Sequence, residues 1–144
     1  MFFTYQQETH NVVIRVEPTY LPEESLPQND QYVFSYHIEI ENLNSSSIQL
    51  ISRHWKILDG KGKIEEVYGT GVVGCQPIIP SKDFFSYSSF CPLPTPTGNM
   101  RGFFEFIDSN KVPFKVPVPL FFLRTDEYGV SSTQRMSKLF FSRP

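Results

Sequence analysis

Twelve prolines spread along the 144 residues constrain this chain more than any other feature. A proline inside a helix lacks the backbone N–H that the helix needs, and its ring clashes with the preceding turn. Long helices are therefore disfavoured and β structure is favoured. Three prolines within residues 91–98 predict an extended loop there, because such a stretch suits neither a helix nor a central strand.

The clearest strand signal lies in residues 32–41, where apolar and polar side chains alternate. One side of this segment carries Tyr32, Phe34, Tyr36, Ile38 and Ile40. Because successive side chains of a strand point to opposite faces, this pattern predicts one buried face and one exposed face.

Further strands are predicted at residues 11–16, 48–58, 63–68, 83–89, 99–107 and 112–123. The first is expected to end at Pro18. About seven short strands separated by turn signals are typical of an all-β sandwich. We therefore expect one sandwich domain over residues 1–123 and an extension over residues 124–144. A short amphipathic helix is an option in that extension, where Met136, Leu139 and Phe140 have helical spacing.

Asp59-Gly60-Lys61-Gly62 predicts a tight hairpin, because Asp-Gly supplies the positive φ angles that such turns need. In the strand before it, the expected inward set is Ile51, Trp55 and Ile57. That placement puts His54 on the outer face and Arg53 on the inner face, where a guanidinium needs acceptors. Arg53 is therefore either a structural tie for a loop or a ligand contact.

Charge and composition argue against several classes of partner. A net charge of −2 provides no global attraction to nucleic acid or to an anionic membrane. The N-terminus lacks the pattern of a signal peptide, and the longest near-apolar run, residues 112–123, is too short to span a bilayer. We expect a soluble cytoplasmic protein. Cys75 and Cys91 form no CxxC pair, so neither a disulfide framework nor a thiolate metal site is expected.

Residues 69–74, GTGVVG, match the glycine spacing of dinucleotide-binding loops, but the context is wrong for that fold. Val72 and Val73 are β-branched, and Pro77 stands where a helix should continue. Two readings remain open. The loop is a bulged crossover between sheets, or it is an anion nest for pyrophosphate or a nucleotide. The candidate ligand-binding residues are Arg53, Gly69, Thr70, Gly71, Gly74 and Arg101.

Several segments together resemble the ApaG family over about residues 10–123. They are YHIEIEN, QLISRHWKILDGKGKIEEVYGTGVVGCQPII, FSYSSFCPLPTPTGNMRGFFEF and FKVPVPLFFL. The resemblance is to small bacterial ApaG proteins, and it implies a fibronectin type III-like, immunoglobulin-like sandwich. It also implies a loose association with cobalt and magnesium efflux and with a neighbouring gene for a diadenosine tetraphosphatase. In eukaryotes the related domain serves in protein interaction, and none of these associations is enzymatic.

A metal site and a catalytic site are both disfavoured. In a fibronectin type III-like sandwich, His37 and His54 would lie on opposite outer faces, so no metal ligands are assigned. No GxSxG elbow is present, and Glu65 and Glu66 point to opposite faces of their strand. We expect no enzyme, no catalytic residues and no cofactor.

Binding is the remaining function, and a protein is the expected partner. The PLPTPTG loop can present a polyproline surface through Pro92, Leu93, Pro94 and Pro96, or it can act as a rigid lid. Pyrophosphate or a nucleotide at the glycine loop is the alternative ligand. The excess of aromatic residues also leaves room for a homodimer interface.

Overall fold

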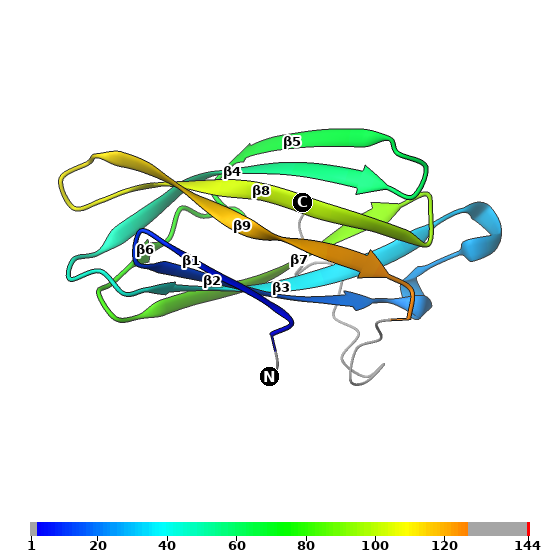
Figure 1. The fold of residues 1–144 in the computed structure, drawn as a ribbon, viewed down its shortest axis with the longest axis horizontal. Helices are drawn as coiled ribbons and strands as arrows, with labels where there is room; N and C mark the ends of the chain where they lie inside the picture. Colours follow the sequence, from blue (N-terminus) through cyan, green and yellow to red (C-terminus); the bar gives the residue numbers. More distant parts are fainter. Residues whose placement is uncertain (1–2, 127–143) are drawn as a thin grey trace.

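Two antiparallel sheets face one another in the computed structural model, which describes residues 3–126 and 144 (Figure 1). The first sheet has the order β1-β2-β3-β7, and its strands are β1 (Tyr5–Thr9), β2 (Val12–Tyr20), β3 (Tyr32–Asn42) and β7 (Phe84–Leu93). The second has the order β5-β4-β8-β9, and its strands are β5 (Ile64–Thr70), β4 (Ile48–Asp59), β8 (Thr97–Ile107) and β9 (Pro113–Arg124). The short β6 (Ile78–Ile79) pairs with β4. The predicted all-β sandwich is confirmed.

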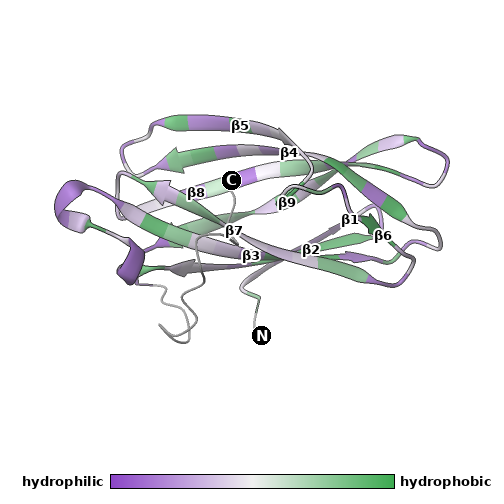
Figure 2. Ribbon diagram, turned by 180° about the vertical axis from the view of Figure 1, so that it is seen from behind, coloured by the Kyte–Doolittle hydropathy of each residue, from purple (hydrophilic) through white to green (hydrophobic). Residues whose placement is uncertain are grey.

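The only helical turns among the described residues are two 3-10 turns between β2 and β3, η1 (Pro22–Glu24) and η2 (Pro27–Asn29). Figure 2 shows hydrophilic colouring over these turns and mixed colouring along the strands. Within residues 3–126, no helix is long and apolar enough to cross a bilayer. The helix predicted around Met136, Leu139 and Phe140 lies outside the described residues.

The core lies between the sheets and is largely aromatic. As the alternation predicts, Phe34, Tyr36, Ile38 and Ile40 of β3 are buried, while Tyr32 at the start of the strand is only half-buried. The ring of Tyr36 lies 5.6 Å from those of Trp55 and Phe121, which belong to the opposite sheet. Interlocking rings of this kind fix how the two sheets sit on one another.

Two predicted strand ends are wrong, and both involve proline. β2 continues through Pro18 to Tyr20, and β7 continues through Pro92 to Leu93, where an extended loop was expected. Hydrogen-bonded pairs at the ends of the two ladders, Leu21 to Val33 and Asn42 to Asp83, set the alternation along each ladder. By that alternation the nitrogens of Pro18 and Pro92 face away from β3, so no ladder bond is lost.

The β4–β5 hairpin forms as predicted, but its positive φ angle is at Gly62 (+89°) rather than at Gly60. Asp59 organises the turn, since its Oδ1 accepts bonds from the N–H groups of Lys61 and Lys63 at 2.8 and 3.0 Å. The turn therefore uses the predicted residues, and only the position of the positive φ angle differs.

A β-bulge between Leu50 and Ser52 changes which side chains of β4 point inward. Trp55 and Ile57 are buried as predicted, but before the bulge the buried residue is Leu50, and Ile51 is only half-buried. A bulge inserts one residue and so reverses the alternation, which is why Ile51 was placed on the wrong face.

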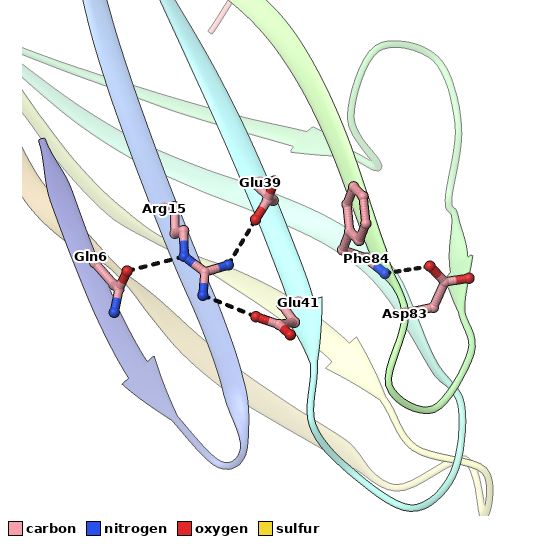
Figure 3. A network of polar contacts seen from close by, with 6 residues as sticks. All are labelled: Gln6, Arg15, Glu39, Glu41, Asp83 and Phe84. Atoms are coloured by element: carbon pink, nitrogen blue, oxygen red, sulfur yellow. Dashed lines mark hydrogen bonds and ion pairs between the residues drawn. The ribbon is translucent and has the colours of Figure 1, made fainter. Parts of the chain in front are cut away.

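The outer face of the first sheet carries an ion-pair network (Figure 3). Arg15 lies 2.7 Å from Glu39 and 2.9 Å from Glu41, and its Nε donates to Gln6 at 3.0 Å. With Glu17 nearby on β2, acids outnumber bases on this face. The outer face of the second sheet has the opposite balance, with Lys56, Arg101 and Lys115 against Glu66 and Glu105.

Candidate functional site

The glycine segment is a tight turn that leaves β5. Gly71 has a φ of +64°, and its N–H donates to the Ile51 carbonyl at 2.8 Å. Val72 is fully buried, and it exchanges two backbone bonds with Cys75, of 2.8 and 2.9 Å. The two central residues of the turn, Val73 and Gly74, both have positive φ angles, and such angles are rare for a β-branched residue like Val73. The segment is thus a hairpin-like turn without a helix.

Several donors of this segment are already used. The N–H groups of Gly71, Val72 and Cys75 bond within the fold, and those of Val73 and Gly74 have no partner among the described residues. An anion nest needs several successive free N–H groups pointing to one place. The arrangement therefore supports the structural reading of the glycines more than the ligand-binding reading.

Arg53 ties the loop to the sheet from the inner side. Its Nη1 donates to the carbonyl oxygens of Thr70 and Gly71 at 3.3 and 2.9 Å. The guanidinium lies against Gly69, where a Cβ would come within 2.5 Å of its carbon. Gly69 is therefore required for the approach of Arg53. The Arg53 guanidinium thus donates its charge-assisted hydrogen bonds to carbonyl oxygens of the chain itself.

Arg101 does not join this cluster. It is exposed on β8 and pairs across the sheet with Lys56, whose side chain is also exposed. Arg53 pairs with the fully buried Phe104 and so lies on the other face of the same sheet. Of the predicted ligand-binding set, the structure brings together Arg53, Gly69, Thr70 and Gly71, and it separates them from Arg101.

Two buried tyrosines, Tyr36 and Tyr87, lie close enough to Arg53 to be affected by its charge. Burial raises the pKa of Tyr36 and of Tyr87, while the positive charge of Arg53 opposes part of that rise. The Tyr87 hydroxyl, the Arg53 Nε and the Trp55 Nε1 are buried without a hydrogen-bond partner in the described part of the chain. Sequence alternation indicated the inward direction of Tyr36 but gave no sign that these polar atoms are buried without partners.

The PLPTPTG segment alternates between buried and exposed positions. Leu93 and Thr95 are buried, whereas Pro92, Pro94 and Pro96 are exposed. The Thr95 hydroxyl accepts a bond from the Gly60 N–H and donates to the Thr97 carbonyl, both at 2.8 Å. The segment is thus fastened to the β4–β5 hairpin. We call its exposed residues Pro92, Pro94 and Pro96 the proline ridge.

Sequence reasoning missed a row of rings on the outer face of the second sheet. The ring of His54 lies 4.3 Å from that of Tyr68 on β5 and 4.5 Å from that of Phe103 on β8, with the latter pair stacked. The Lys115 Nζ lies 4.8 Å from the centre of the Phe103 ring. The alternation along each of the three strands could have placed these residues on one face. The cross-strand register that brings their rings together could not be read from the sequence.

The two histidines considered for a metal lie on opposite outer faces. His54 is on β4 of the second sheet, and His37 is on β3 of the first, with its Nδ1 2.8 Å from the Ser88 Oγ. Burial lowers the pKa of His37, and Glu39 opposes this shift. Within the described residues, no three His, Cys, Asp or Glu side chains are grouped to hold a metal ion.

An open depression of about 340 Å³ lies elsewhere, between the β1–β2, β3–β4 and β8–β9 turns. His10, Asp108 and Phe114 are among its lining residues. None of the predicted site residues lines it.

Comparison with known proteins identifies the family. The family model described as the ApaG domain matches residues 22–108. The chain belongs to the ApaG family. It is 46% identical over 114 residues to the protein ApaG of Bordetella pertussis, covering 79% of this chain and 87% of that protein. It is 43% identical over 119 residues to the protein ApaG of Methylobacterium sp. strain 4-46, covering 83% and 92%.

A solved structure of similar fold is that of the putative ApaA protein from Bordetella pertussis. The TM-score is 0.77 and the identity 47%, with 78% of this chain and 92% of that chain covered. The ApaG domain match includes Arg53, the glycine segment and the proline ridge, but β1, β2 and β9 lie outside it. None of these names describes an enzymatic activity.

Proposed function

We propose that this ApaG protein is a non-enzymatic binding and regulatory module that docks a protein partner through the proline ridge. The supporting observation is the alternation of exposed Pro92, Pro94 and Pro96 with buried Leu93 and Thr95. A surface that is already fixed loses little conformational entropy when a partner binds. Proline has the least backbone freedom to lose, so a ridge of three prolines is well suited to this role.

The link to cobalt and magnesium resistance belongs to this proposal as an indirect effect. His37 and His54 are separated by the sandwich, so they do not offer a joint site. A regulatory partner would carry the effect on metal tolerance. Small-ligand binding at the glycine segment is the competing function, and the use of Arg53 by loop carbonyls counts against it.

The test compares partner capture by the wild-type chain with capture by a ridge variant, in which Pro92, Pro94 and Pro96 are replaced by Ser. The matched control is Pro27→Ser, which removes an exposed proline from η2 outside the ridge. We expect a crosslinked partner that the wild type and the control retain and the ridge variant loses. Equal capture by all three chains would refute a role for the ridge.

A thermal-unfolding series tests the competing function on the same preparations. The ligands are pyrophosphate, diadenosine tetraphosphate, Mg²⁺ and Co²⁺. A ligand that binds only the folded chain raises the unfolding midpoint. We expect no rise. A rise with pyrophosphate that is absent in Arg53→Ala would support the small-ligand function instead.

A further inference from the structure

The outer edge of β5 presents unused backbone groups. Gly71 donates to the Ile51 carbonyl and Asp59 to the Lys63 carbonyl, which places the hydrogen-bonded positions of β5 at odd residue numbers. The N–H groups of Ile64, Glu66 and Tyr68 therefore point away from β4. Nothing in the described part of the chain accepts bonds from them. Figure 1 shows β5 at the margin of the second sheet, beyond β4.

The side chains of the same three residues are exposed on the outer face. Ile64 and Tyr68 are 54% and 64% exposed, which is high for apolar and aromatic residues of a strand. Tyr68 continues the ring row through His54 to Phe103. Glu66 lies between them and makes no hydrogen bond or ion pair within the described residues. An apolar, acidic and aromatic position thus follow one another along this edge.

The other edge strands each have a feature that opposes strand pairing. β1 has only five residues. β7 directs the nitrogen of Pro92 outward, and β9 carries Pro113, Pro117 and Pro119. Short edges and prolines are common protections, because an open edge is a template for another strand. β5 has seven residues and no proline, so neither of these protections applies to it.

We propose that the β5 edge accepts an extended segment of a partner protein as an added strand, with a lysine or arginine opposite Glu66 and apolar residues opposite Ile64 and Tyr68. Main-chain bonds to the three outward N–H groups and their carbonyls supply affinity in such complexes, and alternate side chains supply specificity. The inference rests on the proposed interaction role but uses a different surface from the proline ridge.

Charge disfavours a second copy of this chain as the occupant. The residues of β5 whose backbone groups face away from β4 are Ile64, Glu66, Tyr68 and Thr70. If the β5 strands of two copies paired antiparallel, these residues would have to lie opposite one another. The registers with the most overlap place Glu66 opposite or diagonal to Glu66 of the other copy. Like charges at such positions destabilise strand pairing. Lys56 is the cross-strand neighbour of Glu66 on β4 but forms no ion pair with it, so the Glu66 carboxylate can attract a basic residue on its open side.

The test uses a defined probe, the peptide acetyl-Thr-Val-Thr-Lys-Thr-Val-Thr-amide. Its sequence is symmetric, so lysine can face Glu66 in either strand direction while valines face Ile64 and Tyr68. A twin peptide has glutamate in place of lysine. Amide chemical shifts and hydrogen exchange are followed by NMR as each peptide is added at millimolar concentration. We expect shifts and slowed exchange centred on Ile64, Glu66 and Tyr68.

Three variants separate backbone pairing from charge. Glu66→Pro removes an outward N–H without removing a bond to β4, so we expect a folded chain that binds neither peptide. In the wild type the lysine peptide should bind about two- to five-fold more tightly than its twin, as for exposed ion pairs. Glu66→Gln should remove this preference. Glu65→Gln, which removes an adjacent charge on the other face, should retain it.

Three results would overturn the inference. They are no shifts along β5, equal binding of the two peptides by the wild type, and a wild-type dimer in sedimentation that Glu66→Pro dissociates. The ridge variant should bind the lysine peptide like the wild type. If the peptide fails to bind while the ridge still controls partner capture, the added-strand inference fails and the proposed function stands. If β5 binds the peptide but partner capture does not depend on the ridge, the added-strand inference stands and the proposed function of the ridge fails.

Discussion

Arg53 places a charged group on the inner face of a sheet that otherwise buries hydrocarbon. Its bonds to the Thr70 and Gly71 carbonyls close the end of β5 onto β4, and Gly69 provides the space for it. A charged donor bonded to the part-buried Gly71 carbonyl stabilises the fold because that oxygen would otherwise lack a partner. The residue and the glycine act as one unit.

We predict that Arg53→Ala lowers the free energy of unfolding by about 2 kcal/mol, because it leaves the part-buried Gly71 carbonyl without its charged donor. Gly69→Ala should also destabilise the chain, since its Cβ would displace the guanidinium. In the Arg53→Ala background the cost of Gly69→Ala should shrink. Urea unfolding of the four chains measures this coupling, and strictly additive losses would refute the shared role.

A second residue-scale prediction concerns His37. Burial lowers the pKa of its imidazole. The unfolded chain then binds the proton before the folded chain does. The stability from neutral His37 is complete above about pH 6.5 and is lost as the pH falls through its lower folded pKa. The unfolding free energy of the wild type relative to His37→Gln should therefore decrease from pH 7.5 downward. A relative stability that grows on acidification would contradict this.

At the scale of elements, the β4–β5 hairpin and the β7–β8 connection support one another through Thr95. Its hydroxyl accepts from Gly60 and donates to Thr97, and its side chain touches the space that a Cβ on Gly60 would fill. The two segments are thirty-five residues apart in sequence. Their contact holds the proline ridge in place.

We predict that Thr95→Val, which keeps the shape but removes the hydroxyl, costs about 1–2 kcal/mol of stability because the Gly60 N–H loses its acceptor. Hydrogen exchange at Gly60 should quicken, while exchange at the centre of β3 should change only as global stability changes. Unchanged protection at Gly60 would show that the hydroxyl does not hold the hairpin.

Element patterns also mark how far the sequence could predict this fold. The alternation in β3 is strict and identified its buried face, and the turn signals located the β4–β5 and β8–β9 hairpins. The bulge at Ile51 is a shift of register against β8. The passage of strands through Pro18 and Pro92 depends on the side on which the neighbouring strand lies. That information is absent from a local pattern. The Arg53 contacts and the His54 row need cross-strand register for the same reason.

At the scale of the whole molecule, the two sheets enclose phenolic groups that water does not reach. Tyr36 and Tyr87 project into the core from β3 and β7, near the Arg53 guanidinium. Ionisation of either hydroxyl would place a negative charge in the apolar interior, and burial disfavours that charged form. Alkaline stability of the sandwich is therefore coupled to these two residues.

We predict that Tyr36 and Tyr87 stay protonated as the pH rises past the ordinary tyrosine pKa of about 10. Because their folded pKa is raised, the stability they contribute is complete below that pH and is lost above it. Phenolate absorbance after an alkaline jump should show a fast phase and a slow phase that follows unfolding. Tyr36→Phe should reduce the slow phase. Immediate ionisation of every tyrosine in the folded chain would be inconsistent with this.

The opposite charge balance on the two outer faces gives the described sandwich, residues 3–126, an electric dipole across its thickness. Glu17, Glu39 and Glu41 lie at one pole, and Lys56, Arg101 and Lys115 lie at the other. The field of this dipole therefore orients the sandwich relative to an approaching charged molecule before contact, and salt screens this effect. Orientation on encounter is thus built into a protein whose overall charge is only −2.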